Sequence, residues 1–179
     1  MRFGGFSSFS ILIGLVIGTV SAVNGLSAVG LKAVADSPRW SEWQLASNDR
    51  FLIYGLGHFL SVGQLPPSKS AHMFVRDADE AGNSLRSDCV YVLQGTPSKA
   101  RWWTISVATG SALSAQSELT AGEAVVANDG VLSVVISSRP LPGNWIVPPS
   151  TSTYSVHYVL HEPDADETNK LPSITKKGC

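Results

Sequence analysis

The chain has 179 residues, and its 13 basic and 14 acidic side chains give a formal net charge of −1 at pH 7. It has no basic stripe, which argues against nucleic acid as a partner. There are two cysteines and no C-x-x-C pair, so the common zinc spacings are excluded. Abundant Ser, Thr, Gly, Pro and Val favour strands joined by turns over a helical bundle.

The chain begins with an uncharged run from Phe3 to Leu31. A helix needs about 20 mostly apolar residues to cross a bilayer core, and residues 9–31 supply that length. We therefore interpret residues 1–35 as a membrane anchor whose partner is the lipid bilayer. The alternative is a secretory signal that is cleaved after a small-residue site at 20–22 or 33–35.

Small residues recur every four positions in this segment, at Gly14, Gly18 and Ala22. Residues of this size let two membrane helices approach closely. A homo-oligomer that packs through these three residues is therefore one hypothesis. The simpler interpretation is that small residues are common in membrane segments.

After the anchor, residues 36–163 are predicted to form one domain, followed by a polar, flexible tail at residues 164–179. The first expected strand runs from Ser37 to Leu45. Asn48 then offers a cap for one short helix, because apolar residues follow it at helical spacing. Apolar or alternating patterns between turn signals predict the remaining strands at 71–76, 88–94, 101–108, 123–127, 131–137 and 152–160, with 101–108 apolar on both faces and therefore central.

The strongest turn signal lies between the predicted strands at 123–127 and 131–137. It is Asn128-Asp129-Gly130, a sequence typical of a hairpin. Successive short strands separated by turn residues indicate two packed antiparallel sheets. The predicted fold class is therefore mainly β, an antiparallel β-sandwich with one short helix, preceded by an N-terminal transmembrane helix.

Three stretches occur together in one order: Phe74 to Gly82 (FVRDADEAG), Arg101 to Ile105 (RWWTI) and Gly143 to Pro149 (GNWIVPP). In this order and spacing they resemble the bacterial domain of unknown function 1214 family. The resemblance covers about Ser37 to Pro163 and implies a jelly-roll β-sandwich. It also implies that small single-domain members carry an N-terminal membrane segment, whereas larger members add a second domain of obscure role.

The chain departs from the family pattern in its closing stretch, which reads VLHEP at residues 159–163 where the family tends to end in Arg-x-Tyr. The resemblance brings no established catalytic residues, so none is carried over. We predict a single-pass protein of the bacterial inner membrane with its domain in the periplasm. Cleavage of the N-terminal segment would instead give a secreted periplasmic protein.

The function predicted for the domain is that of a binding or structural module of the cell envelope. The alternative is a hydrolase or lyase that acts on a small envelope metabolite in an aromatic cleft. Neighbouring strand residues point to opposite faces, so one of two adjacent tryptophans should leave the core, and a cleft would form if the tryptophan of the later loop folds over it. The simpler interpretation is core packing plus a loop that Trp145 pins, with Asn144 bonded to the loop backbone. The residues of this candidate cleft are Arg101, Trp102, Trp103, Asn144 and Trp145.

We predict no functional site among the remaining ionisable and sulfur-containing residues. An acidic stretch at 77–88 loosely resembles a calcium loop, but an acidic hairpin turn explains it better. Three histidines on predicted strands are interpreted as surface residues, so neither a metal nor a cofactor is predicted. We interpret Cys89 as a buried small hydrophobe and Cys179 as an exposed thiol, with a disulfide between them as the alternative.

Overall fold

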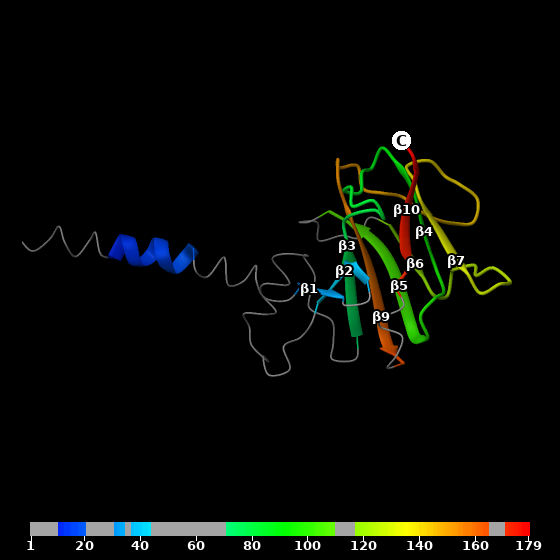
Figure 1. The fold of residues 1–179 in the computed structure, drawn as a ribbon, viewed down its shortest axis with the longest axis horizontal. Helices are drawn as coiled ribbons and strands as arrows, with labels where there is room; N and C mark the ends of the chain where they lie inside the picture. Colours follow the sequence, from blue (N-terminus) through cyan, green and yellow to red (C-terminus); the bar gives the residue numbers. More distant parts are fainter. Residues whose placement is uncertain (1–10, 21–30, 35–36, 44–70, 110–116, 165–170) are drawn as a thin grey trace, which may run out of the picture.

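The computed structural model describes residues 11–20, 31–34, 37–43, 71–109, 117–164 and 171–179. Within these ranges the chain is mainly β, with ten strands in two sheets and a helix at residues 11–20 (Figure 1). The fold class predicted from the sequence is confirmed at this level.

One sheet has six strands in the order β1-β2-β3-β9-β5-β6, and each strand is antiparallel to its neighbours. The long strands at its centre carry the clearest alternation in the sequence, and the predicted strands match them within a few residues. The six strands are β1 (Leu31–Val34), β2 (Ser37–Trp43), β3 (Ala71–Arg76), β5 (Ala100–Ala108), β6 (Ser117–Thr120) and β9 (Ser155–Pro163).

The other sheet has the order β10-β4-β7-β8. It is mixed, because β8 runs parallel to β7 while β10 and β7 are antiparallel to β4. The expectation of antiparallel pairing throughout is therefore wrong here. The loop at 137–143 is long enough for a parallel return because β8 pairs only with residues 134–136 of β7. The strands are β4 (Val90–Gly95), β7 (Leu132–Ile136), β8 (Asn144–Ile146) and β10 (Ser173–Gly178).

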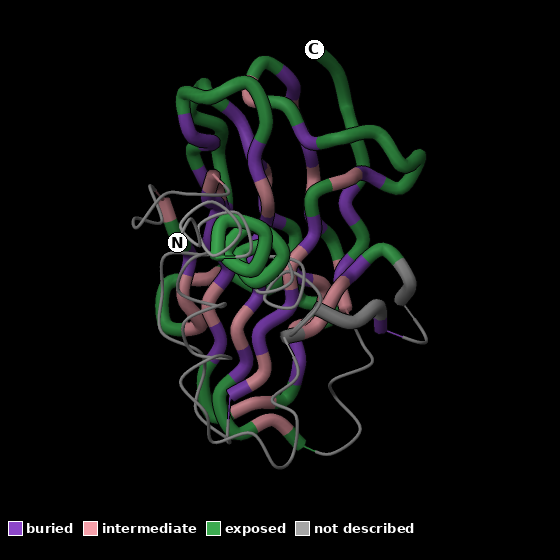
Figure 2. The backbone as a smooth tube through the Cα atoms, turned by 90° about the vertical axis from the view of Figure 1, so that its left-hand side faces the viewer, coloured by how far each residue is buried: buried purple, intermediate pink, exposed green. Residues whose placement is uncertain are grey.

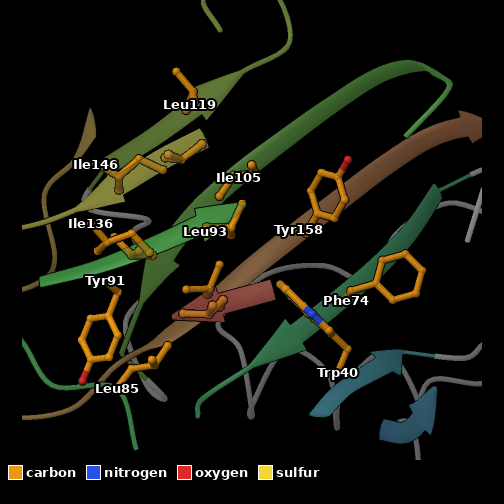
Figure 3. Packing of buried hydrophobic residues seen from close by; sticks show 14 of the residues in the cluster. Trp40, Phe74, Leu85, Tyr91, Leu93, Ile105, Leu119, Ile136, Ile146 and Tyr158 are labelled. Atoms are coloured by element: carbon orange, nitrogen blue, oxygen red, sulfur yellow. The ribbon is translucent and has the colours of Figure 1, made fainter. Parts of the chain in front are cut away.

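The hydrophobic core lies between the two sheets (Figure 3). Side chains alternate across a strand, and in β5 the buried inward side chains are Trp103, Ile105 and Val107. Leu93 of β4 and Ile136 of β7 join the same cluster from the other sheet. Burying one such side chain fully stabilises the fold by about 1.5–3 kcal/mol. Figure 2 shows buried segments along the strands and mostly exposed turns between them.

A hydrogen bond also joins the two sheets where β6 approaches β8. The Val147 amide, just after β8, donates a hydrogen bond of 3.2 Å to Ser117 Oγ at the start of β6. Neither β6 nor β8 is predicted from the sequence, because strands of 4 and 3 residues are too short to show a period. Both are edge strands of their sheets.

The predicted hairpin at residues 128–130 is confirmed, although its first strand is not. The Ala127 amide donates to the Val131 carbonyl at 3.0 Å, and the Gly130 amide donates to the Ala127 carbonyl at 2.9 Å. The predicted strand at 123–127 is reduced to one bridge, Val126 to Leu132. Gly130 has a φ of +80°, a conformation that glycine adopts without steric cost.

The C-terminal segment corrects the prediction of a flexible tail at residues 164–179. Ser173–Gly178 forms β10, which pairs with β4 in register from Ser173 opposite Gln94 to Lys176 opposite Tyr91. Ile174 is fully buried, whereas the other residues of β10 are exposed. A strand with a single buried side chain has a polar composition, which is why the sequence reads as a tail.

The cysteines also correct their sequence interpretation, because Cys89 and Cys179 form a disulfide across 90 residues. Cys89 is buried as predicted, but Cys179 is not a free thiol. The predicted tail kept the two residues apart, whereas the pairing of β10 with β4 brings them together. A disulfide typically contributes about 2–4 kcal/mol to stability.

The N-terminal segment is described in part. A helix at residues 11–20 lies inside the predicted anchor at 9–31. Within the described ranges, no helix combines the length and the apolar character needed to span a bilayer. Leu31–Val34 pairs with β2, so the sheet begins before the predicted domain boundary at residue 36. The short helix predicted after Asn48 lies outside the described residues.

The role of β10 can be tested with Ile174→Ala. Because Ile174 is fully buried, its truncation should lower the free energy of unfolding by about 2–5 kcal/mol, measured by urea denaturation of the oxidised protein. Thr175→Ala is the matched control on the exposed face of β10 and should cost less than about 0.5 kcal/mol. Equal, small effects of both substitutions would show that the C-terminal segment is a tail after all.

Candidate functional site

The two adjacent tryptophans of β5 point to opposite faces, as the sequence predicts. Trp103 is buried in the core and meets Tyr158 edge-on, with ring centroids 6.2 Å apart. Trp102 points outward and is 42% exposed. Its ring lies against Gly122, where an added Cβ would come within 3.0 Å of it. Trp102 is therefore a surface aromatic packed on a glycine.

The Asn144-Trp145 pair lies on β8 in the four-stranded sheet, and its polar atoms bind backbone. The Asn144 amide nitrogen donates to the carbonyls of Val125 and Ser133 at 2.7 and 3.0 Å, and its Oδ1 accepts from the Val125 amide at 2.7 Å. Trp145 Nε1 donates to the Ser137 carbonyl at 2.8 Å. Asn144 thus joins β8 to β7 and to the segment before β7, and Trp145 joins it to the residue that follows β7.

Arg101 stands opposite Glu162 on the antiparallel pair of β5 and β9, and the two charges are 3.3 Å apart. Their side chains are 78% and 55% exposed, so water screens the pair and its contribution to stability is small. The five residues of the predicted cleft therefore lie on two sheets, and each described polar contact joins them to other residues. A cleft shared by all five stays a prediction.

The acidic turn between β3 and the bridge at Ser84 is a compact structural unit. Asp79 is buried, and its Oδ1 accepts hydrogen bonds from the amides of Ala81 and Asn83, each at 2.9 Å. Gly82 has a φ of +87°, which suits glycine. Within the described residues no group of His, Cys, Asp and Glu is arranged to hold a metal ion. The hairpin-turn interpretation is confirmed by these bonds.

Arg76, at the end of β3, is the buried cation of this turn. Its side chain is 2% exposed, and a terminal nitrogen lies 2.9 Å from Glu80 Oε1. Its Nε donates to the Ala78 carbonyl at 2.6 Å, and the guanidinium lies 5.8 Å from the centre of the Trp40 ring. Burial lowers the pKa of Arg76, and the carboxylate of Glu80 opposes that shift. Nη2 is buried and pairs with Glu80 by charge without hydrogen-bond geometry, so this ion pair and the Nε bond together offset the cost of burying the cation.

The same cluster joins both ends of the domain. Trp40 on β2 is buried, and its Nε1 donates to the Pro172 carbonyl at 2.9 Å, just before β10. Glu80 forms two bonds with Ile174 of β10: the Ile174 amide donates to Oε1 at 3.1 Å, and the Glu80 amide donates to the Ile174 carbonyl at 2.9 Å. We call Trp40, Arg76, Glu80 and Ile174 the latch cluster. Sequence reasoning notices the acidic turn but misses these long-range partners.

An open groove of about 800 Å³ is lined by three segments far apart in the sequence: residues 86–88, Ser138 and residues 147–152. Its size falls within the range of small-molecule sites. Val147, Pro148 and Pro149 give it an apolar part, and several serines and an ion pair give it a polar part. None of the five predicted cleft residues lines it.

The polar part of the groove is built on Arg86 and Asp88. The Arg86 guanidinium donates to both oxygens of Asp88, at 2.9 and 2.6 Å. These hydrogen bonds hold the pKa of Asp88 below its ordinary value. Ser87 Oγ donates to the Thr151 carbonyl, which fixes one wall to the other. The groove could accept a ligand with an apolar body and hydrogen-bonding groups. Its only sequence signal is the Pro148-Pro149 pair.

The bonds of Asn144 can be tested with Asn144→Ala. The substitution leaves three backbone groups of Val125 and Ser133 without their partner, so we expect a loss of about 3 kcal/mol in the free energy of unfolding. Leu141→Ala, at an exposed position in the preceding loop, is the control and should change stability by less than about 0.5 kcal/mol. A loss below 1 kcal/mol for Asn144→Ala would mean that water replaces these bonds.

The turn at Asp79 predicts a dependence of stability on pH. Burial acts to raise the pKa of Asp79, but hydrogen bonds from Asn83 and Ala81 outweigh it and hold that pKa below 3.8. A carboxyl with a lowered pKa in the folded state stabilises above its unfolded pKa, and this contribution is lost as pH falls below about 3.8. Urea denaturation between pH 6 and pH 2.5 should show a weaker acid dependence for Asp79→Asn.

The control for this experiment is Asp77→Asn, which removes an exposed carboxylate from the same turn. It should retain the acid dependence of the unmodified protein. If Asp79→Asn leaves the pH dependence of the free energy of unfolding unchanged, the Asp79 carboxylate does not stabilise the turn as described.

Comparison with known proteins identifies a matching family and solved structures with a similar fold. The sequence model of the family described as "Protein of unknown function (DUF1214)" matches residues 70–165. No curated protein matches the sequence. The chain is similar in fold to an uncharacterised protein from Burkholderia cenocepacia, with a TM-score of 0.50 and 18% identity over 62% of this chain and 30% of that one.

A second solved structure is the VPA0106 protein from Vibrio parahaemolyticus, with a TM-score of 0.53 and 16% identity over 70% of this chain and 35% of that one. At these identities the likeness shows the fold alone. The chain spans about a third of the length of both solved proteins. The family match covers more than half of the chain and includes the acidic turn, both β5 tryptophans and the Asn144 loop. The chain therefore belongs to the DUF1214 family of proteins of unknown function.

Proposed function

We propose that the protein is a membrane-anchored component of the bacterial cell envelope whose β-sandwich faces the periplasm as a binding or structural module. The observation that carries this proposal is the disulfide between Cys89 and Cys179. Disulfides persist in oxidising compartments such as the periplasm and are rare in the cytosol. The uncharged run from Phe3 to Leu31 supports the anchor, because it has the length that a bilayer crossing needs.

The groove between residues 86–88 and 147–152 supports the binding role. It combines an apolar part with hydroxyl groups and an ion pair, the mixture expected of a ligand site. We also infer a jelly-roll connection for the sandwich, because the chain passes from sheet to sheet between β3, β4 and β5. Self-association through Gly14, Gly18 and Ala22 stays a prediction.

Localisation of the full chain, expressed in a Gram-negative host, tests this proposal. The protein should remain with the membranes after an alkaline carbonate wash, and protease added to spheroplasts should digest its domain. Both cysteines should resist alkylation until a reductant is added. Leu15→Lys introduces a charge into the uncharged run, at a cost of about 3 kcal/mol for membrane insertion, and should weaken membrane retention.

Two outcomes separate the possibilities. A mature chain that begins after residue 22 or 35 and is released with the periplasm would replace the anchor with a cleaved signal but keep the location. Intact chain in the cytosol with both thiols open to alkylation would refute the proposal.

A further inference from the structure

The C-terminal strand is held to the sandwich by its ladder with β4, by the bonds between Ile174 and Glu80, and by the disulfide. β10 is an edge strand whose neighbour in the sheet is β4. It buries one of its own side chains, Ile174, and the residue before the strand, Pro172, packs against Gly95. The remaining side chains of β10 are exposed to solvent. In Figure 1, β10 (red) lies next to β4.

The rest of the domain has its own connections. β4 remains paired with β7 over five positions when β10 is set aside, and all six strands of the other sheet pair among themselves. The core cluster draws its members from both sheets, and Ile174 is one of many. Detachment of β10 would therefore remove one edge and the bonds to Glu80 and Trp40, while the sandwich keeps its centre.

The two cysteines of the disulfide differ in solvent exposure. Cys89 is 2% exposed, whereas Cys179 is exposed at the end of the chain. Cys89 Sγ lies 3.5 Å from a carboxylate oxygen of Asp88, and Asp88 lines the groove. Cys179 is thus the half of the disulfide that faces solvent. Exposed disulfides of this kind are the ones that undergo exchange.

We propose that the Cys89–Cys179 bond is a redox-controlled clasp on the C-terminal strand. A dithiol reductant supplies the two electrons. Its first thiolate attacks Cys179 Sγ, the bond between the two cysteines breaks, and Cys89 leaves as a thiolate that takes up a proton. The second thiol of the reductant then attacks the mixed disulfide, releases Cys179, and leaves the reductant oxidised.

The consequence of reduction is local. β10 separates from β4, the latch cluster loses Ile174, and the backbone groups along the β4 edge are free to pair with another strand. The six-stranded sheet stays folded. The redox state of the disulfide therefore determines whether the β4 edge is covered by β10 or open to another strand.

Hydrogen exchange of the full chain in detergent micelles, before and after treatment with dithiothreitol, tests the clasp. Without denaturant, reduction should go to completion, and the amides of β10 should then exchange at least about tenfold faster. The amides at the centre of β5 and β9 should change by less than about twofold. Cys179→Ser should reproduce the reduced pattern in the absence of reductant.

Two controls keep the result interpretable. Thr175→Ala alters an exposed residue of β10 with the disulfide intact, and it should keep the slow exchange of the oxidised protein. The far-ultraviolet circular dichroism of Cys179→Ser should show a folded β-protein. The proposal is overturned if reduction requires denaturant, if β10 stays protected after reduction, or if the amides of β5 and β9 accelerate as much as those of β10.

Discussion

The buried guanidinium of Arg76 is the constraint around which the ends of this domain are organised. A cation with a 2% exposed side chain is costly unless its charge and its donors are satisfied. Glu80 supplies the charge, the Ala78 carbonyl accepts from Nε, and the Trp40 ring covers one face. The acidic turn and β2 therefore surround the guanidinium directly, and Glu80 links this cluster to β10. Removal of Glu80 would leave the cation without its counter-charge.

This constraint gives the acidic turn of this chain its structural role. The turn presents Glu80 to Arg76 on one side and to the Ile174 backbone on the other, and Asp79 holds the loop in shape by accepting from two amides. Asn144 plays a comparable part at the opposite margin, where it fastens Val125 and Ser133 around β8. The acidic turn and Asn144 thus secure edges and turns of the sandwich, whereas the end of the third recognisable stretch, Val147 to Pro149, lines the groove.

The central strands could be predicted from the sequence, whereas the edge strands β6, β8 and β10 could not, because the edge strands show too few buried positions. β3, β5 and β9 run for six to nine residues and bury several apolar side chains each, so they are recognisable in the sequence. β6, β8 and β10 are short or bury one side chain, and their positions depend on partners distant in sequence. The same argument covers the site. The outward turn of Trp102 follows from strand geometry, whereas the Trp40 bond to Pro172 and the disulfide depend on long-range pairing.

A double-mutant cycle between Arg76→Met and Glu80→Gln tests the central role of the buried cation most directly. Glu80→Gln alone leaves Arg76 buried without its counter-charge, whereas in the Arg76→Met background that penalty no longer exists. The free energies of unfolding, measured by urea denaturation of the oxidised protein, should therefore give a coupling of at least about 1 kcal/mol. Additivity of the two substitutions within about 0.3 kcal/mol would contradict the account, because it would show that the two side chains stabilise the domain independently.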